Sequence, residues 1–326
     1  MAREGTRQRT GRESIERTLM MSMREAYGKT LVALGRERED IVVLDADLAE
    51  STKTIMFAEE FPDRFRDMGI SEQDMMSTAA GLALAGKTVF VSSFAMFAAG
   101  RAYNQIRNNI CYMNLNVKIV ATHGGISVGE DGSSHQALED LSLMRGLPNM
   151  RVIAPSDARQ TEEVIRFVTE EPGPFYVRLV RPKAPVLYQE NAFTFGRVNK
   201  LRDGNDVSIF AHGLLVSIAL EAAEVLKMRG ISARIYDSPT IKPVDKEAVI
   251  EAAEETGRIL VAEDHSITGG LGSAIAETVV RYKPIPMDFV GVEGFGQSGT
   301  PEMLFRMYGL TSFHIADRAE ALLDRD

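Results

Sequence analysis

Residues 122–136 are the part of this sequence whose residue types and spacing are best suited to chemistry. They run T-H-G-G-I-S-V-G-E-D-G-S-S-H-Q and bring two of the five histidines, His123 and His135, close to the acidic pair Glu130 and Asp131. An imidazole can accept and donate protons at physiological pH because its usual pKa lies near neutrality. Glycines let the backbone approach a small polar ligand closely. The segment therefore predicts a proton-handling loop, and the alternative is a mobile loop of solvated side chains.

The same histidines could in principle bind zinc. A zinc site takes three or four protein ligands, usually histidine and cysteine, and no third histidine or cysteine lies near His123 and His135 in the sequence. We therefore expect no metal ligands on this chain.

The loop follows residues 117–122, V-K-I-V-A-T, an apolar run typical of a buried parallel strand. Further strands are predicted at 41–47, 65–68, 88–94, 151–155, 175–179, 207–211, 233–237, 258–263 and 287–290. Helices are predicted at 14–38, 72–86, 101–111, 157–170 with Ser156 as N-cap, and 214–230. This alternation predicts an α/β fold of mostly parallel sheets flanked by helices, with the loop at the carboxyl end of a strand, where such sheets bind ligands.

The length and composition favour two domains. A chain of 326 residues corresponds to about two domains. Residues 182–205 are rich in Pro, Asn and Gly and lack periodicity, so we place a linker there, between domains at 14–190 and 191–326. Residues 1–13 contain several arginines and are predicted to form a disordered tail.

The composition also excludes several classes of protein. The formal charge of -9 argues against a nucleic-acid surface, which needs a basic patch. A single cysteine, Cys111, excludes an intramolecular disulfide and fits a reducing cytoplasm. No apolar run approaches the roughly 20 residues that span a bilayer, and the first 20 residues lack a signal-peptide core, so we expect a cytoplasmic protein.

A second glycine-rich segment, I-T-G-G-L-G-S-A at 267–274, does not have the G-x-G-x-x-G spacing of a dinucleotide site. We interpret it as a turn that enters a helix. His212 and His265 lie in the same half of the chain and are expected to be structural histidines with satisfied hydrogen bonds.

Several collinear motifs resemble the C-terminal half of a transketolase. These are D-A-D-L-A-E-S-T at 45–52, G-I-S-E-Q at 69–73, S-S-F-A-M-F at 92–97, the loop at 122–136, L-P-N-M-R-V-I-A-P-S-D at 147–157, T-I-K-P-V-D at 240–245 and F-G-Q-S-G-T-P at 295–301. The resemblance covers roughly residues 14–326. It implies a pyrimidine-binding domain followed by a transketolase C-terminal domain, with thiamine diphosphate as cofactor.

The resemblance also implies a reaction and a set of residues at the cofactor. A two-carbon ketol unit would pass from a ketose to an aldose. Glu72 matches the glutamate that bonds N1′ of the cofactor's aminopyrimidine, and Phe97 matches the ring that stacks on it. Phe94 either joins Phe97 at the pyrimidine or belongs to the core.

For the substrate, the resemblance implies that His123 and His135 contact the sugar and that Asp131 binds a sugar hydroxyl. Glu130 should point the other way. Matches to a phosphate site are Arg24, Ser51 and Arg181, with Arg178 as a competing candidate for part of that role. A guanidinium suits phosphate because it donates two parallel hydrogen bonds.

The family binds the cofactor's diphosphate and Mg²⁺ through a G-D-G…N motif on an N-terminal domain, and this sequence contains no G-D-G triplet. The resemblance therefore implies the C-terminal subunit of a split transketolase, active only with an N-terminal subunit that carries this motif, in an α2β2 heterotetramer. The alternatives are the β subunit of a 2-oxo acid dehydrogenase, a deoxyxylulose-phosphate-synthase-like enzyme and a non-catalytic regulatory partner.

Overall fold

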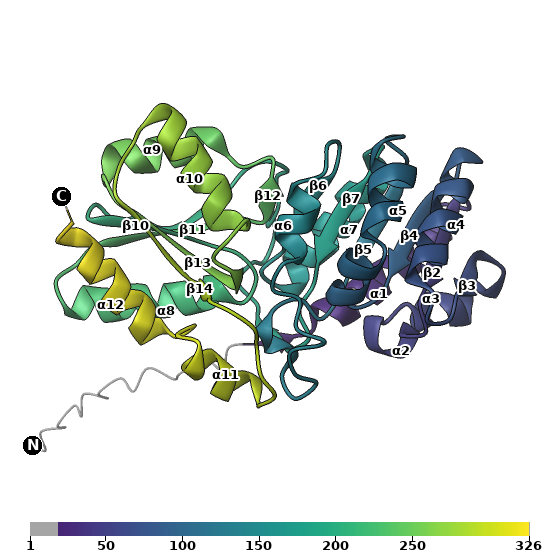
Figure 1. The fold of residues 1–326 in the computed structure, drawn as a ribbon, viewed down its shortest axis with the longest axis horizontal. Coiled ribbons are helices and arrows are strands. Elements are labelled where there is room, and N and C mark those ends of the chain that lie inside the picture. The colour runs from purple at the N-terminus through teal and green to yellow at the C-terminus, as the bar shows by residue number, and fades with distance from the viewer. Residues whose placement is uncertain (1–18, 326) are drawn as a thin grey trace, which may run out of the picture.

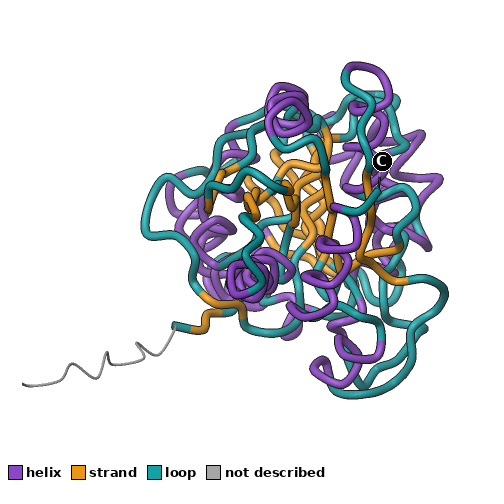
Figure 2. The backbone as a smooth tube through the Cα atoms, turned by 90° about the vertical axis from the view of Figure 1, so that its left-hand side faces the viewer, coloured by secondary structure: helices purple, strands orange, loops and turns teal. Residues whose placement is uncertain are grey.

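The computed structural model describes residues 19–325, which form two mostly parallel sheets with helices packed against both (Figure 1). The predicted α/β fold is thereby confirmed. The predicted tail at 1–13 and the first residues of the helix expected from 14 lie outside the described residues. Viewed from the end, the strands lie at the centre of the molecule with helices around them (Figure 2).

The first sheet has seven strands in the order β12-β6-β7-β5-β4-β2-β3. The strands are β2 (Ile41–Asp45), β3 (Phe65–Asp67), β4 (Thr88–Ser92), β5 (Val117–Ala121), β6 (Arg151–Ile153), β7 (Phe175–Arg178) and β12 (Thr240–Lys242). The accompanying helices are α1 (Met23–Glu37), α2 (Ala49–Thr52), α3 (Ile55–Glu60), α4 (Glu72–Leu84), α5 (Tyr103–Gln105), α6 (Asp140–Arg145) and α7 (Ala158–Glu170). Short 3₁₀ turns occur at Pro62–Arg64 and Ile126–Val128, and π-helical segments occur at Phe97–Arg101 and Ile106–Cys111.

The second sheet has five strands in the order β14-β13-β10-β11-β9. The strands are β9 (Asn199–Arg202), β10 (Val207–Ala211), β11 (Ala233–Asp237), β13 (Ile259–Ser266) and β14 (Met287–Val292). The helices are α8 (Leu215–Met228), α9 (Lys246–Glu255), α10 (Leu271–Tyr282), α11 (Pro301–Met307) and α12 (Ser312–Leu323). A separate two-stranded ribbon pairs β1 (Met20–Met21) with β8 (Ala184–Pro185).

Four local predictions differ from the structure in detail. The first helix begins only at Met23, because Ser22 caps it by accepting a hydrogen bond from the Glu25 amide. The helix at Ala158 is capped by Asp157 rather than Ser156. The expected linker contains β8 and β9, of which β9 pairs antiparallel with β11. The helix expected at 101–111 is largely π-helical.

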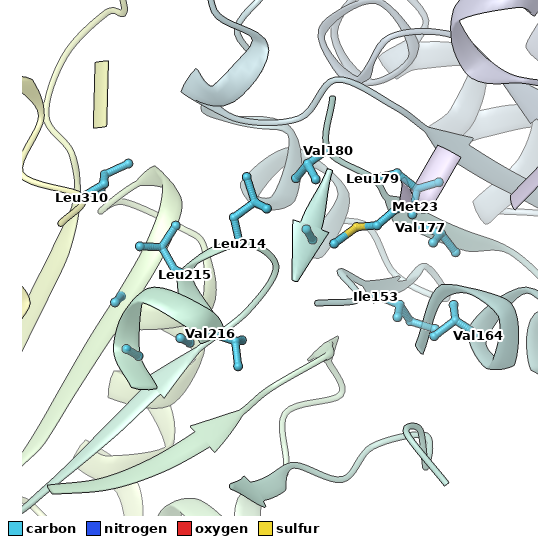
Figure 3. Close-up of a cluster of buried hydrophobic side chains, with 14 of the residues drawn as sticks. Met23, Ile153, Val164, Val177, Leu179, Val180, Leu214, Leu215, Val216 and Leu310 are labelled. Atoms are coloured by element: carbon cyan, nitrogen blue, oxygen red, sulfur yellow. The ribbon is translucent and has the colours of Figure 1, made fainter. Parts of the chain in front are cut away.

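Two clusters of buried apolar side chains each contain residues from both sheets. A continuous cluster of buried apolar side chains runs from Met23 on α1 and Val177 on β7 to Leu214, beside α8, and Leu310, between α11 and α12 (Figure 3). The strand β12 also crosses between the two halves, since it follows β11 in the chain but pairs antiparallel with β6. Burial on both faces explains why the central strands are continuous apolar runs.

A buried ionic network joins the loop at 122–136 to the second sheet. Arg178 at the end of β7 donates from Nε to the Asp140 carboxylate over 3.0 Å and from Nη2 to the carbonyl oxygens of Ala137 and Asp264, each over 2.9 Å. The Asp264 carboxylate on β13 accepts a hydrogen bond from the Ile126 amide over 2.7 Å. The interpretation of Arg178 as a phosphate ligand is therefore wrong, because its guanidinium is buried and used internally.

Among residues 19–325, no helix is both long enough and apolar enough to cross a membrane.

We predict that Arg178→Met lowers the free energy of unfolding by about 3–5 kcal/mol, because it leaves the buried Asp140 carboxylate without its cation. Chemical denaturation followed by circular dichroism measures this change. The matched control is Arg36→Met, which breaks the solvent-exposed pair with Glu60 and should change stability little. Equal effects of the two substitutions would contradict the structural role of Arg178.

Candidate active site

Glu72 is the first residue of α4, directly after the turn that follows β3. A carboxylate is favoured at a helix N-terminus by the helix dipole. Its side chain is only 4% exposed, and Arg101 Nη1 donates a hydrogen bond to its Oε1 over 2.9 Å. The site therefore contains a buried acid that is paired with a guanidinium.

The segment after β4 supplies two phenylalanine rings. Phe94 extends the sheet by a bridge to Thr122, and its side chain is buried. Phe97 begins a π-helical turn, is partly exposed, and lies with its ring centroid 5.8 Å from that of Phe94. The Cζ atom of Arg101 lies 3.9 Å from the centroid of the Phe97 ring. Arg101 thus contacts both Glu72 and Phe97.

His123 is held rigidly at the end of β5. Its φ is +60°, uncommon for a residue other than glycine. Its ring stacks on Phe94 with centroids 3.8 Å apart, and Nδ1 lies 2.8 Å from the Thr122 hydroxyl. Burial, followed by the charges of Arg24 and Arg181, lowers the pKa of His123 to about 3. His123 is therefore neutral at physiological pH, so it can donate a hydrogen bond but is a poor proton acceptor.

His135 lies across the same rings at the other end of the loop. Its ring stands edge-on to Phe97 at 5.1 Å and to Phe94 at 6.3 Å. Its Nδ1 is 3.0 Å from the Ser134 hydroxyl, and its side chain is partly exposed. The structure therefore brings the two predicted histidines to one aromatic cluster, although they lie at opposite ends of the loop in sequence.

Gly125 shows how the loop between His123 and His135 is fixed. It has φ +85° and ψ -177°, and a Cβ atom there would lie 2.2 Å from the Asp264 carboxylate. Only glycine fits such a backbone and such a contact. The Gln136 side chain holds the other end of the loop by donating to the Gln297 carbonyl over 2.9 Å.

Arg24, Ser51 and Arg181 also meet, although they come from distant parts of the chain. Arg24 on α1 donates to the Ser51 carbonyl over 2.7 Å and to the Arg181 carbonyl over 2.9 Å. Burial and the neighbouring Arg181 charge lower the pKa of Arg24. The positive charges of Arg24 and Arg181 repel each other, and an anion beside them relieves that repulsion.

The turn that carries Ser51 is built around Asp45, the last residue of β2. Its carboxylate accepts hydrogen bonds from the Leu48 amide over 2.7 Å, the Thr52 hydroxyl over 2.7 Å and the Thr54 hydroxyl over 2.8 Å. Burial raises the pKa of Asp45 to about 6. The D-A-D-L-A-E-S-T motif is thus a hydrogen-bonded turn that sets the position of Ser51.

Both acidic residues of the loop lie beside Arg181. Its Nη1 is 3.4 Å from Glu130 Oε2 and 3.8 Å from Asp131 Oδ2. The expectation that Glu130 points the other way is therefore wrong. Both carboxylates reach the same guanidinium because Gly129 and Gly132, with φ of +86° and +77°, curl the chain around it.

The side chains lie on α1 and on the segments that follow the carboxyl ends of β3, β4, β5 and β7. A series of contacts joins them in the order Glu72, Arg101, Phe97, His135, Phe94 and His123, and the charges of Arg24 and Arg181, which lies beside Asp131, act on His123. The pair of Glu72 and Arg101 thus lies at one end of the series, and Arg24, Arg181 and Asp131 lie at the other, with aromatic and imidazole rings between them. Sequence reasoning missed Arg101, whose only signal was its position four residues after Phe97.

The second sheet offers no comparable open site at its glycine-rich turn. The Glu263 carboxylate accepts the Leu271 and Gly272 amides at the start of α10, over 2.8 and 3.0 Å. These amides are therefore occupied by the chain itself. His212 and His265 are buried beside Glu263, with nitrogen to oxygen distances of 3.7 and 3.9 Å. His265 Nδ1 lies 2.7 Å from the Ser266 carbonyl, whereas His265 Nε2 and both His212 ring nitrogens have no hydrogen-bond partner among the described residues. The expectation of satisfied hydrogen bonds is therefore met in part for His265 and not for His212.

Comparison with known proteins identifies the family. The family model of the transketolase pyrimidine-binding domain matches residues 20–186, and that of the transketolase C-terminal domain matches residues 196–315. A transketolase C-terminal section from Methanocaldococcus jannaschii is 49% identical over 303 residues, which cover 91% of this chain and 94% of that protein. An apulose-4-phosphate transketolase subunit of Phocaeicola vulgatus is 39% identical over 294 residues, or 89% of this chain and 94% of that protein.

A solved structure of similar sequence supports the same family. It is described as a split gene transketolase, an inactive β4 tetramer, and it superposes with a TM-score of 0.85 at 49% identity, covering 93% of this chain and 98% of that one. The resemblance inferred from the motifs is confirmed, and the chain belongs to the transketolase family.

Proposed function

We propose that this chain is the C-terminal subunit of a split transketolase that transfers a two-carbon ketol unit from a phosphorylated ketose to an aldose. The observation that carries the proposal is the series of contacts from Glu72 to Arg181, which begins with a buried acid beside an aromatic ring and ends with two guanidinium groups. Thiamine diphosphate and Mg²⁺ are the proposed cofactors. The diphosphate and the metal would be held mainly by a separate N-terminal subunit.

The residues at the Glu72 end fit an aminopyrimidine ring. Glu72 offers a buried carboxyl group to a ring nitrogen, and Phe97 offers a partly exposed aromatic face. Phe94 supports Phe97 from behind and belongs to the core. When bound, the cofactor supplies a nucleophilic carbon that allows the bond beside the ketose carbonyl to be broken. Glu72 would set the protonation of the ring nitrogen, which makes it the proposed catalytic acid and base.

The two histidines are proposed to have different tasks. His123 is neutral and buried, with Nδ1 beside the Thr122 hydroxyl, so its other nitrogen suits hydrogen bonding to a substrate oxygen. His135 is partly exposed and suits proton transfer to and from the substrate. Asp131 would bind a sugar hydroxyl at the far end of the loop.

The guanidinium groups of Arg24 and Arg181, with Ser51, would bind the phosphate of the substrate. Charge-assisted hydrogen bonds from guanidinium to phosphate are strong and directional. The name of the Phocaeicola vulgatus relative, which includes a sugar phosphate, supports a phosphorylated substrate.

The requirement for a partner is supported by two further facts. The sequence contains no G-D-G triplet, and the relatives of similar length are described as a C-terminal section, a transketolase subunit and a split gene product. Because subunit interfaces follow closed symmetry, we propose an α2β2 heterotetramer in which each site lies between two kinds of chain.

We predict that this chain alone does not transfer a ketol unit, and that activity appears when it is purified together with a subunit carrying G-D-G…N, thiamine diphosphate and Mg²⁺. A coupled assay with a ketose phosphate donor measures the activity. Omitting each component in turn is the control. Full activity of the chain without a partner would refute the split-subunit proposal.

We predict that Glu72→Gln lowers kcat of the assembled enzyme at least about 100-fold, because a glutamine cannot exchange a proton with the ring nitrogen. Size-exclusion chromatography should show unchanged assembly. Asp74→Asn is the matched control, since Asp74 is an exposed acid in the same first turn of α4. Near-normal turnover of Glu72→Gln would remove Glu72 from the mechanism.

We predict that Arg181→Met raises KM for a ketose phosphate by about 10- to 100-fold, the effect of losing one charge-assisted hydrogen bond. KM for the same ketose without phosphate should stay constant. Lys183→Met, two residues away on the exposed surface, should change neither value. An equal effect on both ketoses would show that Arg181 shapes the loop rather than binds phosphate.

A further inference from the structure

The Glu72 carboxylate and the Phe97 ring share one neighbour, the guanidinium of Arg101. Nη1 of Arg101 donates to Glu72 Oε1 over 2.9 Å, and Cζ lies 3.9 Å from the Phe97 centroid. The Arg101 side chain is 47% exposed, whereas that of Glu72 is 4% exposed. Arg101 is therefore a solvent-accessible cation resting on a buried acid and an aromatic ring.

The backbone holds Arg101 in this position. Phe97 and Arg101 are the first and last residues of one π-helical segment, a feature that often marks functional sites. The Gln73 side chain donates to the Arg101 carbonyl over 3.0 Å, which ties this segment to the first turn of α4. The π-helical backbone and the hydrogen bond from the Gln73 side chain thus both hold Arg101 beside Glu72.

The two groups that Arg101 occupies are the two that an aminopyrimidine would need. On the proposed function, the ring nitrogen bonds the Glu72 carboxyl group and the ring stacks on Phe97. A ring that bonded Glu72 Oε1 and stacked on the covered face of Phe97 would need the space that the guanidinium fills. Arg101 in its observed place therefore competes with that use of Glu72.

We propose that Arg101 is a gate. In the chain without cofactor it takes the place of the aminopyrimidine and compensates the buried charge of Glu72, and it must swing away before the cofactor binds. This inference rests on the proposed function. The apparent affinity for the cofactor is then reduced by the fraction of molecules in which the gate is open.

The first test uses the chain alone and needs no partner. Thermal unfolding midpoints are compared for Arg101→Met, Glu72→Gln and the double variant. Arg101→Met should lower the midpoint by several degrees because the buried carboxylate loses its partner, and the double variant should recover most of that loss. Arg107→Met, an exposed arginine on the next turn, should change nothing. Additive effects would show that the pair does not form and would overturn the gate.

The second test measures the dissociation constant of thiamine diphosphate by calorimetry in the assembled enzyme with Mg²⁺. Arg101→Met should tighten binding about tenfold, as expected if about nine in ten molecules hold the gate closed. Arg101→Lys, which keeps a cation, should bind more weakly than Arg101→Met, and Arg107→Met should match the unmodified enzyme.

The outcomes separate the gate from the proposed function. If the unmodified assembly binds the cofactor and Arg101→Met binds it equally or more weakly, Arg101 is no gate, and weaker binding would make it a cofactor ligand. If the unmodified assembly does not bind thiamine diphosphate at all, the proposed function fails and the gate fails with it.

Discussion

The buried contacts of Arg178 and Asp264 are the constraint on which the rest of the site depends. Arg178 donates to the Asp140 carboxylate at the start of α6, to the Ala137 carbonyl directly after the loop and to the Asp264 carbonyl of the second sheet, while the Asp264 carboxylate accepts from the Ile126 amide. A buried charge is stable only when it is paired and hydrogen-bonded, so these groups allow one relative placement of the two sheets and the loop. The orientation of His123 and His135 follows from that placement.

The site that results follows the carboxyl ends of strands of the first sheet. Its residues lie at the ends of parallel strands, where backbone groups and helix termini are available for ligands. Glu72 with Phe97 lies at one end of the series of contacts and the pair of Arg24 and Arg181 at the other, which suits a ligand with a basic ring at one end and an anion at the other. Such an arrangement can bind and orient a ligand, but excluding water from it requires a second surface. This physical need supports a partner chain independently of any motif.

Much of this arrangement could be predicted from the sequence, for identifiable reasons. The buried strands were found because apolar runs of four to eight residues are a local signal, and β10 and β11 have the predicted bounds. Loop residues such as His123 and Asp131 were found because ordered motifs fix their positions relative to the strands. Asp157 was missed as a cap because Ser and Asp are equally good there, and only the side-chain contact decides. Glu130 was misplaced because adjacent side chains need not point in opposite directions in a turn whose glycines have positive φ.

The pairing of Arg101 with Glu72 could not be predicted, since it joins residues 29 positions apart through a π-helical turn that leaves no local pattern.

The pairing of Arg101 with Glu72 meets two physical requirements that conflict in a split enzyme of this kind. On the proposed function, Glu72 is poorly hydrated in the assembled site, yet the chain that carries it folds before its partner and cofactor arrive. An unpaired buried carboxylate would destabilise that intermediate state, and a fixed internal cation would disable the acid afterwards. A guanidinium on a flexible, half-exposed side chain satisfies both demands, because it can pair with the acid early and move into solvent later. On the proposed gate, Arg101 stabilises the free chain and lowers its affinity for the cofactor.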